Sequence, residues 1–519
     1  MRRLLTVFLL GSLGALRADE RAKPLGLGDL GPEEFRAKAA ADLRCARAWA
    51  ERLRSVVDRA EARPALFAEA PSAWTLDENR ELRGLWQAVL DHAYALEGVK
   101  RLYGDAKGLK GAAKDEAFAL SHAAGLAQYC EGLRWIALTR GRDRLEKVLD
   151  EADPAQGIPA KAFADLKFKL LHLATIARFL SSERKFSKRL PALSASPMGV
   201  GEDGPWLLGY PLDASERTHD LLKQRGLQDV LGNGADVVGD LSFEAWFPAQ
   251  KAVAEWMGDT RVCRLKRNLI RSAQARELCA RMVPGDVGVE RRNWYLSNVG
   301  LPGFWPHAVL YVGTPEEASK AYDADPGVRA WLATLPGAPA TLEAAIAAAS
   351  PEAFRAWKDP AEEGNPRRVL EAVSEGVVLN SVEESLCGDY AAALRPRLKP
   401  VDRAKALLEA FRHFGKPYDF NFDFDTDGTL VCSELVYKAY LPGAGKEGLR
   451  IPLCEVCGRR TLPPNEIIRL LDEEGDAPER QFDVVGFLDG REKEKDAVFR
   501  DASTLRASWK RPKWDIAQE

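Results

Sequence analysis

The first long segment of the chain repeats apolar residues at the spacing of an α-helix. In DLRCARAWAERLRSVV, apolar positions recur every three or four residues, which places them on one helix face: Leu43, Ala46, Ala50, Leu53 and Val57. The same period continues through ELRGLWQAVLDHAYALEGVKRLY, DEAFALSHAAGLAQYCEGLRWIAL and FADLKFKLLHLATIARFL, with Gly- and Pro-containing breaks between them. The pattern predicts an antiparallel helical bundle over residues 19–190.

Short apolar runs replace this period in the second half of the chain. HAVLYVG, at 307–313, and QFDVVGFLDG, at 481–490, predict strands, and RRVLEAVSEGVVLNSVEE predicts a hairpin that turns at 374–376. An Ala-rich helical insertion at about 315–365 and the helix VDRAKALLEAFRHFG lie between the strands. This order predicts an α+β domain over residues 276–490, with a small antiparallel sheet or barrel and a helix that carries Cys432.

The segments on either side of this domain are more polar. Residues 191–275 are rich in turn-forming residues and predict a connector that contains one helix, EAWFPAQKAVAEWM. Residues 491–519, with REKEKD near their start, predict a loosely held tail.

Charge and the N-terminus narrow the class of protein. The net charge is −3 and no basic block is interleaved with aromatic residues, which argues against a nucleic-acid partner. Arg2 and Arg3 precede an uncharged apolar stretch at 4–16, and Ala18 suits cleavage, so residues 1–18 predict a signal peptide and an exported, periplasmic or secreted protein. An uncleaved anchor is the alternative. No later segment holds the roughly 18 uncharged apolar residues of a spanning helix, so no transmembrane span is expected after signal removal.

The stretch DFDTDGTLVCSELVYKAY, at 423–440, allows two interpretations. Five of its residues satisfy the calcium-loop pattern D-x-D-x-D-G-x5-E: Asp423, Asp425, Asp427, Gly428 and Glu434. Calcium loops of this kind lie between two helices and usually occur in pairs. Here Pro417 breaks the preceding helix, YDFNFDF alternates like an extended chain, and no second loop is found.

The second interpretation is a catalytic cysteine. Cys432 stands where an apolar helix begins, and the unpaired N–H groups and positive dipole of a helix N-terminus favour a thiolate. Glu434, in the first turn, carries a negative charge that opposes the thiolate, so a partner imidazole has to supply most of the activation. The acidic run before Cys432 is then a solvated turn.

Candidate partners for the thiol follow from position along the chain. Outside the predicted bundle the histidines are His219, His307 and His413, and we favour His307 because it opens a buried strand directly after GFWP. Glu371 lies on the next predicted strand and is the favoured residue to orient the imidazole, ahead of Glu375 and Glu383.

The remaining cysteines give little support for a metal. The chain has eight cysteines, and CEVC at 454–457 allows a local disulfide. As a zinc half-site it lacks a second C-x2-C pair. We therefore expect no metal and no cofactor.

A set of segments resembles a known family. PGDVGVERR, WPHAVLYVG, RVLEAV-SEGVV, GKPYDF and VCSELVYKAY occur in the order seen in YiiX-like, circularly permuted papain-fold enzymes of the NlpC-type superfamily, which also includes lecithin retinol acyltransferase. His307 precedes Cys432 in the chain, which is the permuted order. The resemblance covers about residues 280–490 and does not include the bundle.

The resemblance implies roles for four residues. Cys432 is the expected nucleophile, His307 the general base and acid, Glu371 the orienting residue, and Tyr418 a residue that lines the site and contacts substrate. The implied reaction is hydrolysis of an amide or peptide bond through a thioester, with cell-wall peptides among the expected substrates.

Two alternatives stay open. One is a lipid-directed thioesterase or acyltransferase on the same fold, with Trp294, Phe304 and Trp305 lining an acyl groove. The other is a non-catalytic calcium-binding protein.

Overall fold

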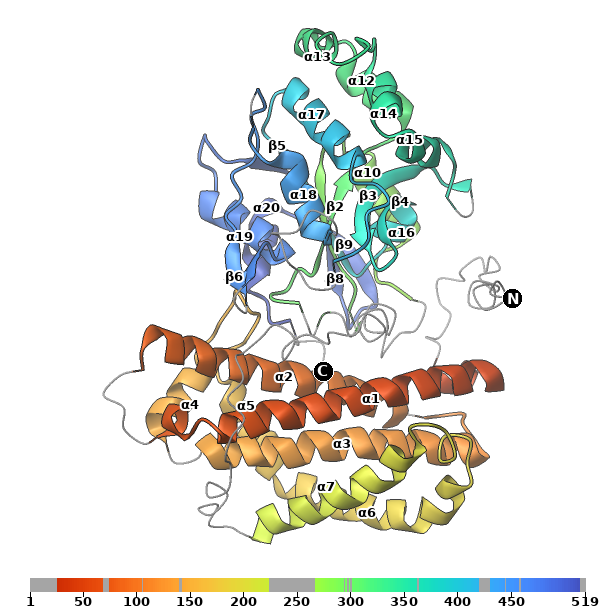
Figure 1. Ribbon diagram of the computed structural model, residues 1–519, viewed down its shortest axis with the longest axis vertical. Coiled ribbons are helices and arrows are strands. Elements are labelled where there is room, and N and C mark those ends of the chain that lie inside the picture. Colours follow the sequence, from red (N-terminus) through yellow and green to blue (C-terminus); the bar gives the residue numbers. More distant parts are fainter. Residues whose placement is uncertain are drawn as a thin grey trace.

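The chain folds into a helical part followed by a part built around a β-sheet. The computed structural model describes residues 26–68, 74–104, 106–139, 142–223, 267–293, 295, 298, 301–361, 364–419, 430–443, 445–456 and 459–513. Figure 1 shows the helical part, in red to yellow, below the sheet-containing part, in green to blue. This arrangement confirms the predicted α+β class with a helical region before it.

Long helices that pack side by side form the N-terminal bundle. Its helical segments are η1 (Leu27–Asp29), α1 (Pro32–Glu61), η2 (Pro64–Phe67), α2 (Leu76–Gly104), α3 (Gly111–Thr139), α4 (Asp143–Leu149), α5 (Ala162–Leu171), α6 (Leu173–Ser194) and α7 (Gly204–Lys223). α3 lies at the centre and contacts α1, α2, α5, α6 and α7. A helix surrounded in this way needs apolar side chains on most of its circumference, and α3 has them.

The bundle continues past residue 190, where the sequence pattern places its end. α7 packs along α3, so the first part of the predicted connector is a bundle helix. The Gly- and Pro-rich turn between α6 and α7 reverses the chain, and Pro211 within α7 conceals the helical pattern in the sequence. The helix predicted at EAWFPAQKAVAEWM lies outside the described residues.

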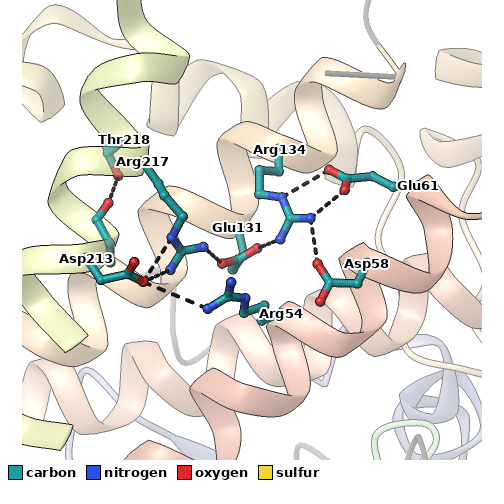
Figure 2. A network of polar contacts seen from close by, with 9 residues as sticks. Arg54, Asp58, Glu61, Glu131, Arg134, Asp213, Arg217 and Thr218 are labelled. Atoms are coloured by element: carbon teal, nitrogen blue, oxygen red, sulfur yellow. Dashed lines mark hydrogen bonds and ion pairs between the residues drawn. The ribbon is translucent and has the colours of Figure 1, made fainter. Parts of the chain in front are cut away.

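An ionic network centred on one buried carboxylate joins three helices of the bundle (Figure 2). The Glu131 carboxylate, on α3, is fully buried and accepts hydrogen bonds from Arg134 Nη1 at 2.6 Å and Arg217 Nη1 at 2.9 Å. Arg134 also binds Asp58 and Glu61 of α1, at 2.6 and 2.5 Å. Because Arg217 belongs to α7, the network ties α1 and α7 to the central helix.

An antiparallel sheet of seven strands forms the framework of the second part. Its order is β4-β3-β2-β1-β5-β8-β9, and every neighbouring pair is antiparallel. The strands are β1 (Val287–Arg291), β2 (His307–Tyr311), β3 (Arg367–Val373), β4 (Gly376–Ser381), β5 (Tyr390–Pro396), β8 (Phe482–Arg491) and β9 (Asp496–Arg500), and a separate hairpin holds β6 (Cys454–Val456) and β7 (Arg459–Thr461). β3 and β4 form the hairpin that the sequence predicts at 374–376.

Helices cover both faces of this sheet. They are α10 (Ser272–Cys279), α16 (Val382–Ser385), α17 (Pro400–Phe411), α18 (Cys432–Tyr440), α19 (Pro464–Glu474), α20 (Ala502–Ala507) and η4 (Ser508–Lys510). Successive residues of β2 alternate between two cores: Ala308 and Leu310 join the larger one with α17 and α18, whereas Val309 and Tyr311 join the smaller one with α10.

The predicted insertion forms four short helices at the far end of the domain from the bundle (Figure 1). They are α12 (Pro315–Tyr322), α13 (Pro326–Leu332), α14 (Leu342–Ala349) and α15 (Pro351–Lys358). They pack on α17, where the Trp357 and Phe411 rings lie 4.8 Å apart. Since β2 leads directly into α12, its other end, which begins with His307, faces the bundle.

The described residues of the predicted tail are ordered parts of the fold. β9 pairs with β8, and α20 packs on α19. Lys513 is buried and binds Asp91 of α2 with Nζ–Oδ1 2.8 Å, while its carbonyl accepts from Arg291 at 2.7 Å. This part of the chain therefore links the bundle to β1. The sequence did not predict this link, because the polar residues of 491–513 form ion pairs rather than an apolar pattern.

Candidate active site

The end of β2 nearest the bundle brings a histidine and a buried carboxylate together. His307 is the first residue of β2, and Glu371 lies on the neighbouring strand β3. The His307 Nε2 and Glu371 Oε2 atoms are 2.7 Å apart. The Glu371 side chain is 4% exposed and that of His307 is 19% exposed, so water can reach the imidazole but scarcely the carboxylate.

Two neutral donors hold the second oxygen of Glu371. Asn380 Nδ2 donates to Oε1 at 2.9 Å, and Ser385 Oγ donates to the same oxygen at 2.5 Å. Burial alone raises a carboxyl pKa, but the bond and charge of His307, together with Ser385 and Asn380, lower the pKa of Glu371 to about 2. Glu371 is therefore an anion across the physiological pH range.

Cys432 is the first residue of α18, and its side chain is buried. Burial raises the pKa of a thiol. Here the charge and hydrogen bond of His307, with the backbone N–H groups of Ala308 and Ser433, outweigh burial and lower the pKa of Cys432 below its ordinary value. Nε2 of His307 faces Glu371. The other ring nitrogen, Nδ1, is therefore the one available for the hydrogen bond with the Cys432 sulfur.

The pKa of His307 moves in the opposite direction. Burial disfavours the imidazolium, yet the charges and hydrogen bonds of Cys432 and Glu371 raise the pKa of His307 well above its ordinary value. A lowered thiol pKa beside a raised imidazole pKa describes a thiolate–imidazolium pair. A helix N-terminus, a histidine and an orienting carboxylate are the parts needed for nucleophilic attack on a carbonyl carbon.

Tyr418 lies close to the sulfur. It forms a parallel bridge with Leu430, two residues before Cys432. Burial and the nearby Cys432 charge raise the pKa of the Tyr418 phenol well above its usual range. The structure thus brings all four predicted residues into one place.

The other candidate histidines lie elsewhere. His219 is on α7 and binds Glu183 of the bundle at 3.0 Å. His413 follows α17 and faces Glu409 at 3.7 Å. Of the competing carboxylates, Glu375 lies in the exposed turn between β3 and β4, and Glu383, on α16, pairs with Arg276.

Glu434 is less anionic than its position in the first turn of α18 suggests. Burial raises its pKa to about 7, against the effect of Lys438 at 3.0 Å. Its Oε2 accepts from the Val431 N–H at 3.3 Å, so it caps the helix. Glu434 therefore carries less negative charge near Cys432 than the sequence suggests, and it disfavours the thiolate less.

Sequence reasoning missed three groups around the histidine. Asn380 could have been found, because the predicted hairpin at 374–376 sets it opposite Val369, two residues from Glu371. Ser385, on α16, and Glu290, the β1 residue paired with His307, carry no sequence signal without the sheet order. Burial raises the pKa of Glu290, against Arg292 and His307.

The acyl groove, the calcium loop and the local disulfide that the sequence allows involve residues that the structure describes only in part. Phe304 and Trp305 are core residues, 4% and 0% exposed, and Trp294 lies outside the described residues. Most of the calcium-loop pattern, residues 423–429, also lies outside them. Cys454 carries a free thiol, and its proposed disulfide partner Cys457 is not described.

Two further properties concern the part of the chain that the structure describes. There, no group of three or more His, Cys, Asp or Glu side chains is arranged to hold a metal ion. Among the helices that the structure describes, none combines the length and apolar character needed to cross a membrane.

Comparison with known proteins agrees with this geometry. No curated protein and no solved structure matches the chain. The sequence profile of the permuted papain-like amidase family, YaeF/YiiX, C92, matches residues 281–475. That range contains Cys432, His307, Glu371 and Tyr418, and it excludes the bundle. The resemblance predicted from the sequence is thus confirmed: residues 281–475 are similar to the permuted papain-like amidases, which suggests cysteine hydrolase activity.

Proposed function

We propose that this protein is an exported cysteine hydrolase that cleaves an amide or peptide bond through a thioester on Cys432. The observation that carries the proposal is the position of His307, which lies between the buried carboxylate of Glu371 and a thiol at a helix N-terminus. The family match supports an amide substrate, and the resemblance favours cell-wall peptides.

Acylation begins from the thiolate–imidazolium pair. The Cys432 sulfur attacks the carbonyl carbon, and the carbonyl π electrons move to oxygen. The Cys432 backbone N–H at the start of α18 stabilises that oxyanion. His307 then gives its proton to the leaving amine, the C–N bond breaks, and an acyl thioester and a neutral imidazole remain.

Deacylation reverses the roles of the same groups. Neutral His307 takes a proton from water, and the hydroxide attacks the thioester carbonyl. The C–S bond breaks, a carboxylic acid leaves, and the thiolate and imidazolium are restored. Glu371 stays ionised throughout, because its pKa of about 2 lies far below the working pH. It orients the ring and stabilises its charge.

The test is selective alkylation of Cys432 by iodoacetamide near pH 6, followed by peptide mass mapping. Cys432 is 5% exposed and has a lowered pKa, whereas Cys454 is half-buried and burial raises its pKa to about 11. If ionisation governs reactivity, Cys432 labels first and Cys454→Ala leaves the rate unchanged. His307→Ala should slow the labelling of Cys432 by roughly 10- to 100-fold.

A contrary pattern would reject the proposal. Labelling of Cys454 ahead of Cys432 in the folded protein would show that exposure governs reactivity. Equal rates in wild type and His307→Ala would show that the imidazole does not activate the thiol. With a library of peptides as substrate, Cys432→Ala should abolish hydrolysis, and any remaining activity would assign the reaction to other residues.

A further inference from the structure

The bundle contains a cavity that the catalytic residues do not use. Its volume is about 440 Å³, and residues of α2, α3, α5 and α6 line it. The floor is one face of α3 from Phe118 to Tyr129, which at 1.5 Å per residue is about 16 Å long. α2 and α6 pack against this helix, and α5 contributes lining residues near Tyr129. The cavity is thus long enough for an extended chain of carbon atoms.

The α3 residues of the floor near Phe118 are uncharged, although Arg189, which is paired with Asp115, lies 4.5 Å from the Phe118 ring. His122 is buried, and burial lowers its pKa to about 4, so the ring is neutral at physiological pH. Its Nδ1 lies 2.7 Å from Ser182 Oγ, which satisfies both groups. The Phe118 ring stacks on His122 at 5.8 Å, and Leu126 continues the apolar surface.

Tyr129, at the other end of the lining, carries a buried hydroxyl without a partner in the described part of the chain. Tyr129 is 5% exposed, and its hydroxyl has no hydrogen-bond partner among the described residues. Burial of an unpaired hydroxyl costs about 1–3 kcal/mol. Burial also raises the pKa of Tyr129 to about 12, so it remains a donor. A ligand with an acceptor group at this position would relieve that cost.

Two cations lie at the same end. The Tyr129 ring packs 5.4 Å from Phe179, whose neighbour Arg178 lines the cavity together with Lys169 of α5. Lys169 forms no ion pair with any described residue, and the Arg178 guanidinium contacts only the neutral Ala174 carbonyl and Thr175 hydroxyl.

The remaining charges of the lining do not cancel these two. Asp165 is the lining carboxylate nearest to Lys169 and Arg178 along the chain. One carboxylate beside two cations gives this end of the cavity a net positive charge. Along α2, Lys100 and Arg101 bind Glu97, and Lys100 also donates to Gln128, the neighbour of Tyr129 in the chain.

We propose that this cavity binds a single-chain anionic amphiphile of the fatty-acid class. The carboxylate lies between Lys169 and Arg178 and accepts a hydrogen bond from the Tyr129 hydroxyl. The hydrocarbon chain lies along α3 toward Phe118. The exposed apolar side chains of Phe168 and Leu171, 69% and 44% exposed, flank the α5 lining residues and provide an apolar entrance.

Calorimetry with the full chain tests the proposal. The probes are dodecanoate, dodecan-1-ol and dodecyltrimethylammonium, each below its micelle concentration. Dodecanoate should bind with one ligand per chain, at least tenfold more tightly than the other two, and equally well to Cys432→Ala. Equal affinity for the cationic probe, no binding of dodecanoate, or loss of binding in Cys432→Ala would overturn the proposal. The last result would place the ligand in the active site.

Matched variants locate the site. Lys169→Glu should weaken dodecanoate binding about tenfold or more, because it replaces a cation with an anion. Lys188→Glu, an equally exposed change on α6 outside the cavity, should have no effect. Equal effects of the two changes would assign binding to general surface charge and overturn the proposal.

Tyr129→Phe separates a ligand contact from a structural role. It removes a hydroxyl without a partner, so it should leave the melting temperature unchanged or higher while weakening dodecanoate binding severalfold. A lower melting temperature with unchanged affinity would assign the hydroxyl to the fold and overturn its part in the site. Sedimentation with anionic phospholipid vesicles, in the absence of dodecanoate binding, would assign the cations to a membrane surface instead.

Discussion

Glu131 in the bundle and Glu371 in the sheet are both buried carboxylates, and both are bound by cations. Arg134 and Arg217 hold Glu131 at 2.6 and 2.9 Å, and His307 holds Glu371 at 2.7 Å (Figure 2 shows the first of these sites). The difference lies in the partner. A guanidinium does not release its proton in a protein, whereas an imidazolium does so near neutral pH.

The two cations differ in what they allow their glutamate to do. Around Glu131 the charges are fixed, so the network only joins α1, α3 and α7. Around Glu371 the partner also touches a thiol, so a proton can move between His307 and Cys432 while the carboxylate stays ionised. A buried glutamate is therefore a guide to catalysis only when its partner can titrate.

The largest expected effect is on folding and comes from Glu131→Gln. The substitution removes the buried carboxylate that two partly buried arginines share, and it should lower the free energy of unfolding by about 3–5 kcal/mol. Urea unfolding followed by circular dichroism measures it. The labelling rate of Cys432 in the folded variant should match wild type. A stability loss below about 1 kcal/mol would contradict a structural role for the network.

The second effect is a contribution of Glu371 to the pH dependence of stability. Its folded pKa, about 2, lies below the ordinary value of roughly 4.3, so ionised Glu371 stabilises the fold. This contribution is complete above pH ~4.3 and is lost as the pH falls toward 2, a total of about 2–3 kcal/mol.

The difference in unfolding free energy between wild type and Glu371→Gln isolates this term. It should be largest near pH 5 and shrink as the pH falls. A difference independent of pH between 2 and 5 would mean that Glu371 does not titrate as a stabilised anion.

The third effect is on the reactivity of Cys432. Glu371→Gln should slow its alkylation, whereas Glu131→Gln should not. Without the carboxylate, the raised pKa of His307 falls and the thiolate loses its counter-charge. Alkylation of Cys432 at pH 6 should slow by roughly 10- to 100-fold, and the midpoint of its pH profile should move up. An unchanged profile would remove Glu371 from the activation of the thiol.

The sequence predicted the contact between His307 and Glu371 but not the contact between Glu131 and Arg217, for a physical reason. His307 and Glu371 open or occupy short strands, and strands that follow each other in sequence usually pair, so their contact could be inferred locally. Glu131 binds Arg217 of α7, and nothing in a helical period says which helices become neighbours. Ser385 and Glu290 could not be predicted for the same reason, because their contacts depend on how distant elements are arranged around the sheet.

The predicted boundaries show the same limit. The bundle was expected to end at residue 190, because Gly and Pro residues interrupt the helical pattern there. α7 nevertheless belongs to the bundle, since its contacts with α3 come from distant parts of the chain. Likewise, the order of residues 491–513 depends on pairing with β8 and on the buried Lys513–Asp91 ion pair.

The smallest effect tests how finely Glu371 is positioned. Ser385→Ala removes one neutral donor from Oε1 and leaves Asn380 in place. Loss of such a hydrogen bond is worth about 0.5–1.5 kcal/mol, so the pKa of Glu371 should rise and the labelling of Cys432 should slow by less than about tenfold. Ser374→Ala, in the exposed β3–β4 turn, is the matched control and should change neither. A purely structural role for Ser385 would lower stability without moving the pH profile. A shift of the profile would show that Ser385 acts on the thiol through Glu371 and His307.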